Sequence, residues 1–311
     1  MQVYDFGKLR NNKVTISDRI GRPLGLVDGS QVFSTMFRYE QEGKVSHEIV
    51  LSTIGPENYR EICNVTFYLI DAPGACAQAA KFLGERNIDI LNSVSLSMIS
   101  DVCMVWKMMV DLSYFGDSAS LREEFDGLKR QRSSVLSMMD SMVIESSKIS
   151  DRYAKGIIAP GSSVKARAIK RAQKAPSVIC GNEYEVPVEF LRAMEGVKEG
   201  SPYIMVADQD SWVLSISPLK EGVDLVQFDF MIPDRPGAIF EVTSSMASHS
   251  INLLSVKTKV VVYYETMSMS VVADISGYKG GDLEALRSKT EAHVTKLKGD
   301  FKLTGFKRIE L

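Results

Sequence analysis

Cysteine and histidine are scarce in this sequence. The seven residues of these two types are Cys63, Cys76, Cys103, Cys180, His47, His249 and His293. The cysteines are scattered singly and form no Cys-x-x-Cys pair, so their spacing predicts no zinc or iron–sulfur site. We expect them to be reduced thiols of the protein core.

The sequence also lacks a large net charge and any long apolar run. A net charge of −2 argues against nucleic-acid binding by the whole surface, although a local basic patch remains open. No apolar run approaches the roughly 20 residues of a membrane span. The N-terminal sequence MQVYDFGKLRNNK lacks the apolar core of a signal peptide. These absences favour a cytoplasmic protein with no membrane contact.

Catalytic motifs are missing as well. The sequence holds no GxSxG, no HExxH, no Walker loop and no dinucleotide fingerprint in context. Its histidines lie in unrelated segments, which indicates no Ser/His/Asp set. His249 comes late in an expected helix, where a surface or capping role is favoured. We expect a binding protein that is not an enzyme and needs no cofactor or metal.

A duplication dominates what the sequence does contain. Residues 65–76, VTFYLIDAPGAC, resemble residues 228–239, FDFMIPDRPGAI, and both carry Asp-x-Pro-Gly-Ala after an alternating apolar stretch. The offset is 163 residues, from Asp71 to Asp234, and it holds without a gap as far as Ser113. Such a series of matches at one offset predicts a duplicated domain.

Each copy predicts the element order βαββαβ. Alternating apolar residues before the Asp-x-Pro-Gly turn indicate a strand, and apolar residues three and seven positions apart after it indicate a helix. Two apolar stretches, a second helix and a closing strand follow. We expect the second helices to carry Leu121, Phe125, Leu128 and Val135 in the first copy and Leu286, His293 and Leu297 in the second. This pattern predicts an α+β fold with two helices on one face of an antiparallel sheet.

The turn, the element order and the duplication together resemble the ACT domain, over residues 64–150 and 226–311. The resemblance implies two ferredoxin-like domains that pair side by side and hold an amino acid at the paired interface. The ligand then meets the strand–helix turn of one domain and the start of the second strand of its partner. Carried onto this sequence, those positions are Asp71, Ala72, Pro73, Gly74, Ala75, Asn87, Ile88 and Asp89, and Asp234, Arg235, Pro236, Gly237, Ala238, Ser250, Ile251 and Asn252. Because Ala72 stands where the second copy has Arg235, we expect the first copy to be structural.

Two interpretations of the turn remain open. In the first, Gly74 and Gly237 let a ligand approach the backbone, and the N–H groups of the first helical turn accept its carboxylate. Asp71 and Asp234 could then bind an ammonium group. In the second, the aspartate caps the helix, the proline begins it and the glycine only turns the chain.

A smaller repeat precedes each copy. Residues 25–30, GLVDGS, resemble residues 196–201, GVKEGS. Residues 13–33, and more loosely residues 184–206, are similar to the swapped-hairpin DNA-binding module of the AbrB type. That resemblance implies two intertwined copies that present basic residues to DNA, with candidates Lys8, Arg10, Lys13, Arg19 and Arg22, and Arg192 and Lys198 from the second copy. Alternatively, both blocks are plain strand–turn–strand packing, and Glu189, Glu195 and Glu199 disfavour phosphate contacts.

A basic segment separates the two halves. Residues 152–182 hold seven positive and no negative side chains, and VKARAIKRAQKA within them predicts a helix. This helix is either a solvated basic face or a contact for nucleic-acid phosphates or an acidic partner. The candidate contacts are Lys165, Arg167, Lys170 and Arg171.

The expected domains are an AbrB-like module in 1–60, an ACT-like domain in 61–150, a basic linker in 151–183, a second AbrB-like module in 184–222 and a second ACT-like domain in 223–311. We favour the function of an amino-acid-sensing transcriptional regulator, in which the bound ligand shifts the arrangement of the smaller modules. The alternative is a regulatory subunit that docks on an amino-acid biosynthetic enzyme for feedback control. Because ACT-like sheets associate edge to edge, we also expect a homodimer.

Overall fold

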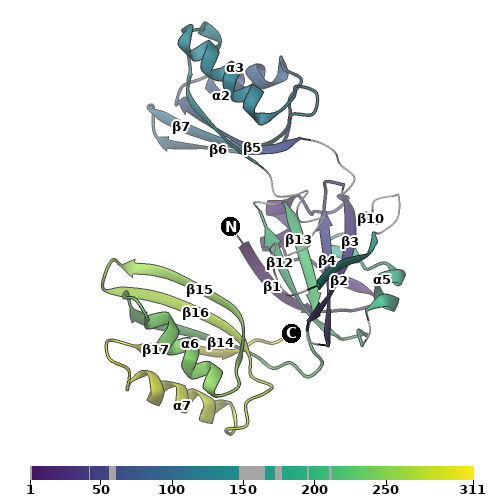
Figure 1. The fold of residues 1–311 in the computed structure, drawn as a ribbon, viewed down its shortest axis with the longest axis vertical. Helices are drawn as coiled ribbons and strands as arrows, with labels where there is room; N and C mark the ends of the chain where they lie inside the picture. Colours follow the sequence, from purple (N-terminus) through teal and green to yellow (C-terminus); the bar gives the residue numbers. More distant parts are fainter. Residues whose placement is uncertain are drawn as a thin grey trace. The chain divides into compact units, whose positions relative to one another are not determined.

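The computed structural model of the protein describes residues 2–41, 43–55, 61–146, 165–171, 177–194, 196–209 and 212–311 (Figure 1). Over these residues it is a strand-rich α+β protein with six α-helices and several antiparallel sheets. By its internal packing the chain divides into two compact units, residues 1–5, 11–197 and 204–217, and residues 6–10, 198–203 and 218–311.

The first larger repeat forms its own four-stranded antiparallel sheet with two α-helices. Along the chain its elements are β5 (Ile62–Ile70), α2 (Ala75–Gly84), β6 (Asp89–Ile99), β7 (Cys103–Asp111), α3 (Ser118–Arg130), the short 3-10 helix η2 (Ser134–Leu136) and β8 (Met139–Ser146). The strands lie in the order β6-β7-β5-β8. This is the first βαββαβ repeat.

The second βαββαβ repeat follows the same plan. Its elements are β14 (Leu225–Pro233), α6 (Ala238–Ser248), β15 (Asn252–Val262), β16 (Thr266–Asp274), α7 (Leu283–Val294) and β17 (Lys302–Arg308). The strands lie in the order β15-β16-β14-β17, so each element occupies the place of its counterpart in the first repeat. The element order expected from the duplication is therefore the observed one.

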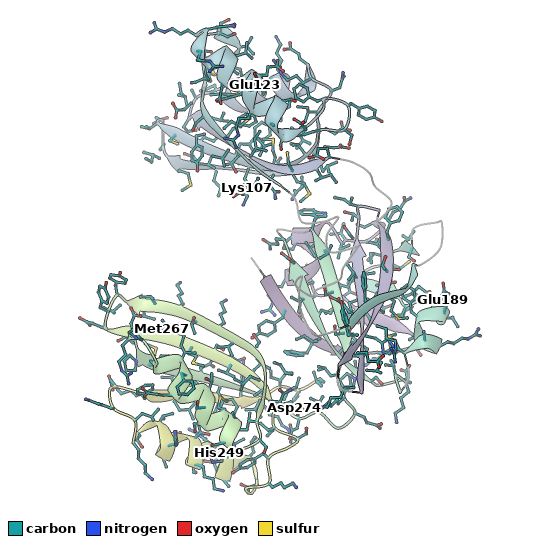
Figure 2. All side chains as sticks on the ribbon, viewed as in Figure 1. Lys107, Glu123, Glu189, His249, Met267 and Asp274 are labelled. Atoms are coloured by element: carbon teal, nitrogen blue, oxygen red, sulfur yellow. The ribbon has the colours of Figure 1, made fainter. Side chains whose placement is uncertain are left out.

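The cores lie between each sheet and its helices. The alternating residues Val65, Phe67 and Leu69 of β5 are all buried at or below 1% exposure, because successive side chains of a strand point to opposite faces. In Figure 2, Lys107 of β7 lies on the side of the sheet away from α3, which carries Glu123. The period of two in the sequence thus places one face of each strand in the core.

Both second helices end earlier than the sequence suggested. Helix α3 stops at Arg130, and Arg132 adopts a φ of 52°, a left-handed value that an α-helix cannot continue through. Val135 consequently lies in η2 and is 38% exposed instead of packing from the helix. Leu297 lies beyond the end of α7, although it still packs against the core.

The strands of the two smaller repeats pair with one another. The first supplies β2 (Lys13–Thr15), β3 (Gln31–Gln41) and β4 (Lys44–Ser52). The second, with the end of the basic segment before it, supplies β10 (Ser177–Val178), β11 (Glu183–Glu185) and β13 (Val213–Pro218). β2 pairs with β11, β3 with β10 and β4 with β13, each antiparallel. With β1 (Gln2–Lys8) and β12 (Pro202–Asp208), most of these strands form one sheet of order β1-β12-β13-β4-β3-β10. The remaining pieces are the short helices α1 (Asp18–Gly21) and α5 (Val188–Ala193) and the 3-10 helix η1 (Arg22–Leu24).

The helix expected in the basic segment is a strand. Residues 165–171 form β9 (Lys165–Arg171), which pairs antiparallel with β3. Helix propensity is a weak preference, and pairing with the free edge of an existing strand outweighs it here. The side chains of Lys165, Arg167, Lys170 and Arg171, the candidate contacts, lie outside the described part of the structure.

The four cysteines differ sharply in exposure. Cys63 is buried, and burial raises the pKa of its thiol to about 12, so it stays protonated at neutral pH. Cys180 is exposed. We predict that iodoacetamide modifies Cys180 in the folded protein and reaches Cys63 only after unfolding, as peptide mass spectrometry of timed samples can measure. Equal rates at the two thiols would contradict the burial of β5.

Candidate functional site

The strand–helix turns of the two βαββαβ repeats have the same backbone geometry. Gly74 and Gly237 are the N-cap residues of α2 and α6, with φ values of 94° and 89°. Such left-handed values favour glycine. A Cβ at Gly74 would meet nothing within 4 Å, and one at Gly237 would meet only Arg235 Nη1 at 3.9 Å. The space above each glycine is open.

The helices begin without a side-chain cap. Neither Gly74 nor Gly237 has a side chain to offer, and Pro73 and Pro236 lie one residue before the cap instead of at the first helical position. Of the two interpretations of the turn, the one in which the aspartate caps the helix and the proline begins it is therefore wrong in both of these respects. The first N–H groups of an α-helix have no intrahelical acceptor. Here those of Ala75 and Ala238 donate to the turn carbonyls of Ala72 and Arg235 at 3.2 and 3.3 Å, so the donors for another group are the N–H groups that follow them.

Asp71 and Asp234 tie the turn to a neighbouring hairpin. The Asp71 carboxylate accepts a hydrogen bond from the backbone N–H of Asp101 at 3.1 Å, and the Asp234 carboxylate accepts one from Tyr264 N–H at 2.8 Å. Asp101 and Tyr264 are counterparts in the β6–β7 and β15–β16 hairpins, and both have a φ of 62°. The backbone N–H of each aspartate also donates to a hairpin carbonyl, that of Asp234 to Glu265 at 3.0 Å. The aspartate therefore fixes the hairpin beside the turn.

We predict that Asp234→Ala loosens the β15–β16 hairpin. The loss of a hydrogen bond to a charged acceptor should lower the free energy of unfolding by about 1–2 kcal/mol. Hydrogen exchange at the Tyr264 amide should accelerate, while exchange at the counterpart Asp101 stays unchanged. Unaltered protection of Tyr264 would show that the carboxylate does not hold the hairpin.

Arg235 is held by its own repeat. Its guanidinium lies 2.9 Å from a Glu241 carboxylate oxygen and donates to the Lys298 carbonyl at 2.9 Å. In the first repeat Gln78, the counterpart of Glu241, reaches the corresponding segment directly by donating to the Ser134 carbonyl at 3.1 Å. The arginine therefore links α6 to the chain before β17.

The start of the second strand offers mainly backbone. Ile88 and Ile251 are buried in the two cores, so only their main-chain groups can meet a ligand. Asn87 and Ser250 just before them have φ values of 53° and 58°. Asp89 and Asn252 are exposed, whereas Ala75 and Ala238 are buried.

The second turn carries aromatic residues that sequence reasoning missed. Tyr263 and Tyr264 are 71% and 77% exposed, and their ring centroids are 4.1 Å apart. The hydrogen bond with Tyr264 and, less strongly, the charge of Asp234 raise the pKa of the Tyr263 phenol. Ser100 and Asp101 are their counterparts in the first repeat. The duplication itself could have flagged this difference.

Each sheet has an exposed edge strand. β6 and β15 end their strand orders, so one side of each lacks a partner strand within its sheet. Apolar side chains along them are exposed, at 58% for Leu96 and 62% for Met98 in β6 and 56% for Val261 in β15. An exposed apolar edge can pair with another strand.

The candidate DNA contacts of the smaller modules are partly neutralised. Lys13 is 2.9 Å from Glu183 and Arg22 is 2.9 Å from Asp18. Arg19 donates to the Tyr4 carbonyl, and Lys198 is 2.7 Å from Glu221. Lys8, Arg10 and Arg192 belong to the same candidate set, and all three are exposed.

Over the residues the structure describes, no group of three or more His, Cys, Asp or Glu side chains is placed to hold a metal ion. None of the helices in this part of the chain is long and apolar enough to cross a membrane.

Comparison with known proteins gives only loose likenesses. No protein-family model and no curated protein matches the sequence. Among solved structures, a protein provisionally described as a glycine cleavage system transcriptional repressor is 12% identical, with a TM-score of 0.25 over 82% of this chain and 100% of that one. An unknown protein from Galdieria sulphuraria is 11% identical, with a TM-score of 0.24 over 81% and 99%. A Bacteroides thetaiotaomicron protein is 6% identical, with a TM-score of 0.17 over 78% and 94%. Superpositions this loose assign neither a family nor a function.

Proposed function

We propose that this protein is a cytoplasmic, amino-acid-binding regulator whose two βαββαβ repeats are ACT-like domains. One observation carries the proposal: both repeats keep the same strand order, the same left-handed glycine at the helix start and the same aspartate-held hairpin beside it. In both repeats the turn leaves open space beside the N–H groups at the start of the helix. Such a helix start suits a small anionic group.

The second repeat is the proposed ligand-binding copy. The carboxylate of the amino acid meets the N–H groups at the start of α6, and Asp234 lies beside it for the ammonium group. The exposed pair Tyr263 and Tyr264 adds aromatic surface near this turn, which the first repeat lacks. The first repeat then serves as the structural partner.

Pairing of the edge strands completes the proposed site. Within the part of the chain that the structure describes, β6 and β15 both present unpartnered, partly apolar edges. An edge-to-edge pair, within one chain or across a homodimer, brings the start of a second strand to the turn of its partner domain. The backbone at Ile88 or Ile251 then faces the ligand.

The proposed output is transcriptional control through the smaller modules. Their strands are interleaved, as in the swapped-hairpin modules they resemble. The ion pairs of Lys13 and Arg22 reduce the charge available for phosphates. The alternative output is docking on an amino-acid biosynthetic enzyme for feedback control. DNA retention that falls steeply with salt supports the first output; co-purification of an enzyme without DNA retention supports the second.

The sensing proposal is tested by melting the full chain with each of the twenty amino acids at millimolar concentration. A ligand bound only by the folded state stabilises it by about 2.7 kcal/mol at a hundredfold excess over Kd. We expect one chemical class to raise Tm. No rise with any amino acid would overturn the proposal.

A further inference from the structure

Three phenylalanines fill the space between the helices and the sheet in the first βαββαβ repeat. Phe67 comes from β5, Phe82 from α2 and Phe125 from α3, and their ring centroids are 5.9–6.2 Å apart. Each is at most 3% exposed. The helices α2 and α3 therefore pack on a core of aromatic side chains.

An ion pair links α2 and α3 at the outer edge of this aromatic core. Arg86 Nη2 lies 2.6 Å from Glu124 Oε1, which joins the end of α2 to α3. The guanidinium also lies 3.9 Å over the Phe82 ring and donates to the Phe82 carbonyl at 2.6 Å.

The second repeat replaces most of this arrangement. The offset of 163 residues makes Phe230, Ser245 and His249 the counterparts of Phe67, Phe82 and Arg86. His249 Nδ1 lies 2.8 Å from the Ser245 carbonyl, as Arg86 contacts the Phe82 carbonyl, so the backbone correspondence holds. His249 is also the C-cap residue of α6, in agreement with the expected capping role.

The second helices correspond through their caps. Asp117 and Asp282 each accept a hydrogen bond from the amide three residues on. This alignment makes Lys289 and Thr290 the counterparts of Glu124 and Phe125. Two of the three phenylalanines have therefore become Ser245 and Thr290, and the ion pair has become His249 and Lys289.

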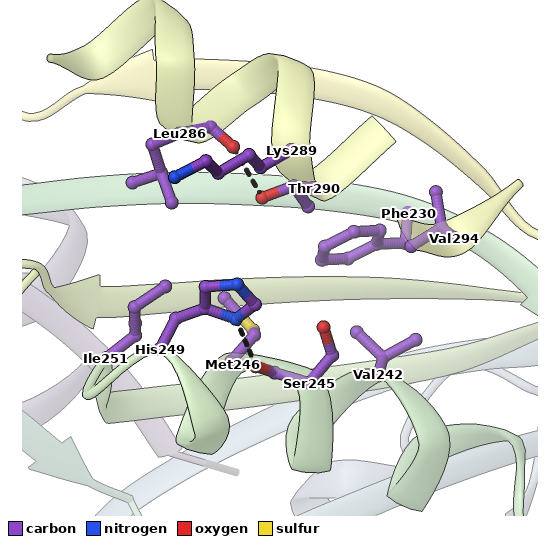
Figure 3. Close-up of a pocket in the computed structure, with 10 residues that line it drawn as sticks. All are labelled: Phe230, Val242, Ser245, Met246, His249, Ile251, Leu286, Lys289, Thr290 and Val294. Carbon is purple, nitrogen blue, oxygen red and sulfur yellow. Dashed lines mark hydrogen bonds between the residues drawn. The ribbon is translucent and has the colours of Figure 1, made fainter. Parts of the chain in front are cut away.

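A pocket lies where the two rings are missing (Figure 3). Six apolar side chains and the four polar ones, Ser245, His249, Lys289 and Thr290, line it, and none of the ten is acidic. Its space is that of about one water molecule, so a larger occupant must part the side chains of α6 and α7. The cleft combines an apolar floor with a few polar groups, the usual make-up of a ligand site.

A buried polar group next to the pocket has no partner within the described chain. The Tyr278 hydroxyl is buried and makes no hydrogen bond there, and its ring centroid is 6.4 Å from that of His249. Buried hydroxyls are normally hydrogen-bonded, but this one lies against Gly280 and Tyr278 does not line the pocket, so it is a neighbour of the site and not part of it. Lys289 Nζ lies 5.6 Å from the centre of the Tyr278 ring and donates to the Gly280 carbonyl at 2.8 Å.

We propose that this pocket of the second βαββαβ repeat binds a short-chain carboxylate. The Lys289 ammonium and the Ser245 hydroxyl donate to the carboxylate, and the apolar floor receives the alkyl end. The Thr290 hydroxyl and His249 Nδ1–H only border the site, because they donate to the carbonyls of Leu286 and Ser245 at 2.8 Å each. The site lies toward the C-terminal end of α6, whereas Gly237 lies at its N-terminal end, so it is distinct from the turn. The first repeat cannot bind this ligand because its phenylalanines occupy the space.

The test is calorimetric titration of the full chain with sodium acetate, propionate and butyrate against sodium chloride. Saturable binding of at least one acid is expected at millimolar concentration. Lys289→Glu should weaken it about tenfold or more, because it replaces the cation with an anion. Lys296→Glu, the same change on an exposed residue outside the pocket, should leave it unaltered. The double variant Ser245→Phe and Thr290→Phe, which restores the packing of the first repeat, should abolish it.

Two results would overturn this pocket proposal. One is no saturable heat with any of the three acids. The other is binding that Lys289→Glu leaves at full strength; this variant decides the matter even if the double variant fails to fold. Gly237→Val separates the two sites, because it should remove an amino-acid response and leave carboxylate binding intact.

Discussion

Phe82→Ala is expected to lower the free energy of unfolding by about 3–5 kcal/mol, the usual loss when a buried phenylalanine becomes alanine. Phe82 is fully buried and contacts the rings of Phe67 and Phe125, so its removal leaves a cavity under α2. Ser245→Ala at the counterpart position should cost less than about 1 kcal/mol, because no ring is lost there. Urea unfolding, with amide exchange of α2 and α6 followed separately, measures both.

The contrast between the two variants is the informative quantity. A loss at Ser245 as large as that at Phe82 would mean that the second repeat is packed like the first, and would remove the pocket. Phe82→Leu, which keeps most of the apolar volume, serves as the control and should lose less than the alanine variant.

Gly237→Val is expected to abolish the stabilisation of the protein by its amino-acid ligand. A β-branched residue at a φ of 89° carries backbone strain of about 1–3 kcal/mol, and its side chain lies over the start of α6. The measurement is Tm with and without the amino acid that stabilises the unmodified protein most.

Gly74→Val is the matched control for this variant. It carries equal strain at a φ of 94° and has open space around it, but it alters the proposed structural copy. The ligand-induced rise in Tm should therefore survive. Loss of the rise in Gly74→Val alone would assign the ligand to the first repeat, against the present proposal.

Much of the fold could be predicted from the sequence because the duplication repeats each signal. The alternation at Val65, Phe67 and Leu69 and the apolar period after Gly74 identify a strand and a helix, and the second copy supplies the same pattern independently. The two glycines were singled out for unusual dihedrals, and both adopt left-handed φ values. Local signals of this kind survive because they coincide with the core.

Several individual long-range contacts were beyond sequence reasoning. The helix propensity of residues 165–171 predicts a helix. They form a strand because they pair with the edge of β3. One of the two interpretations of the turn placed the carboxylate of Asp71 at the helix, yet it accepts from the Asp101 amide 30 residues away. Charge in the small modules was likewise overestimated, because Lys13 meets Glu183 from the other half of the chain.

The pocket of the second repeat shows what comparison of the two copies adds. Ser245 and Thr290 attract no attention as single residues, since small polar side chains are common in helices. Aligned with Phe82 and Phe125, they mark the place where core volume is missing. The tyrosines at 263 and 264 stand out in the same way against Ser100 and Asp101.

The most direct test of the sensing proposal is an NMR titration of the isotope-labelled full chain with the amino acid that raises Tm most. The amide resonances of Gly237, Ala238 and Ile239 are predicted to shift more than those of Gly74, Ala75 and Cys76, and to saturate together with the rise in Tm. If the resonances of these amides do not shift with any of the twenty amino acids, the turn of the second repeat is not a ligand site and the sensing proposal is wrong.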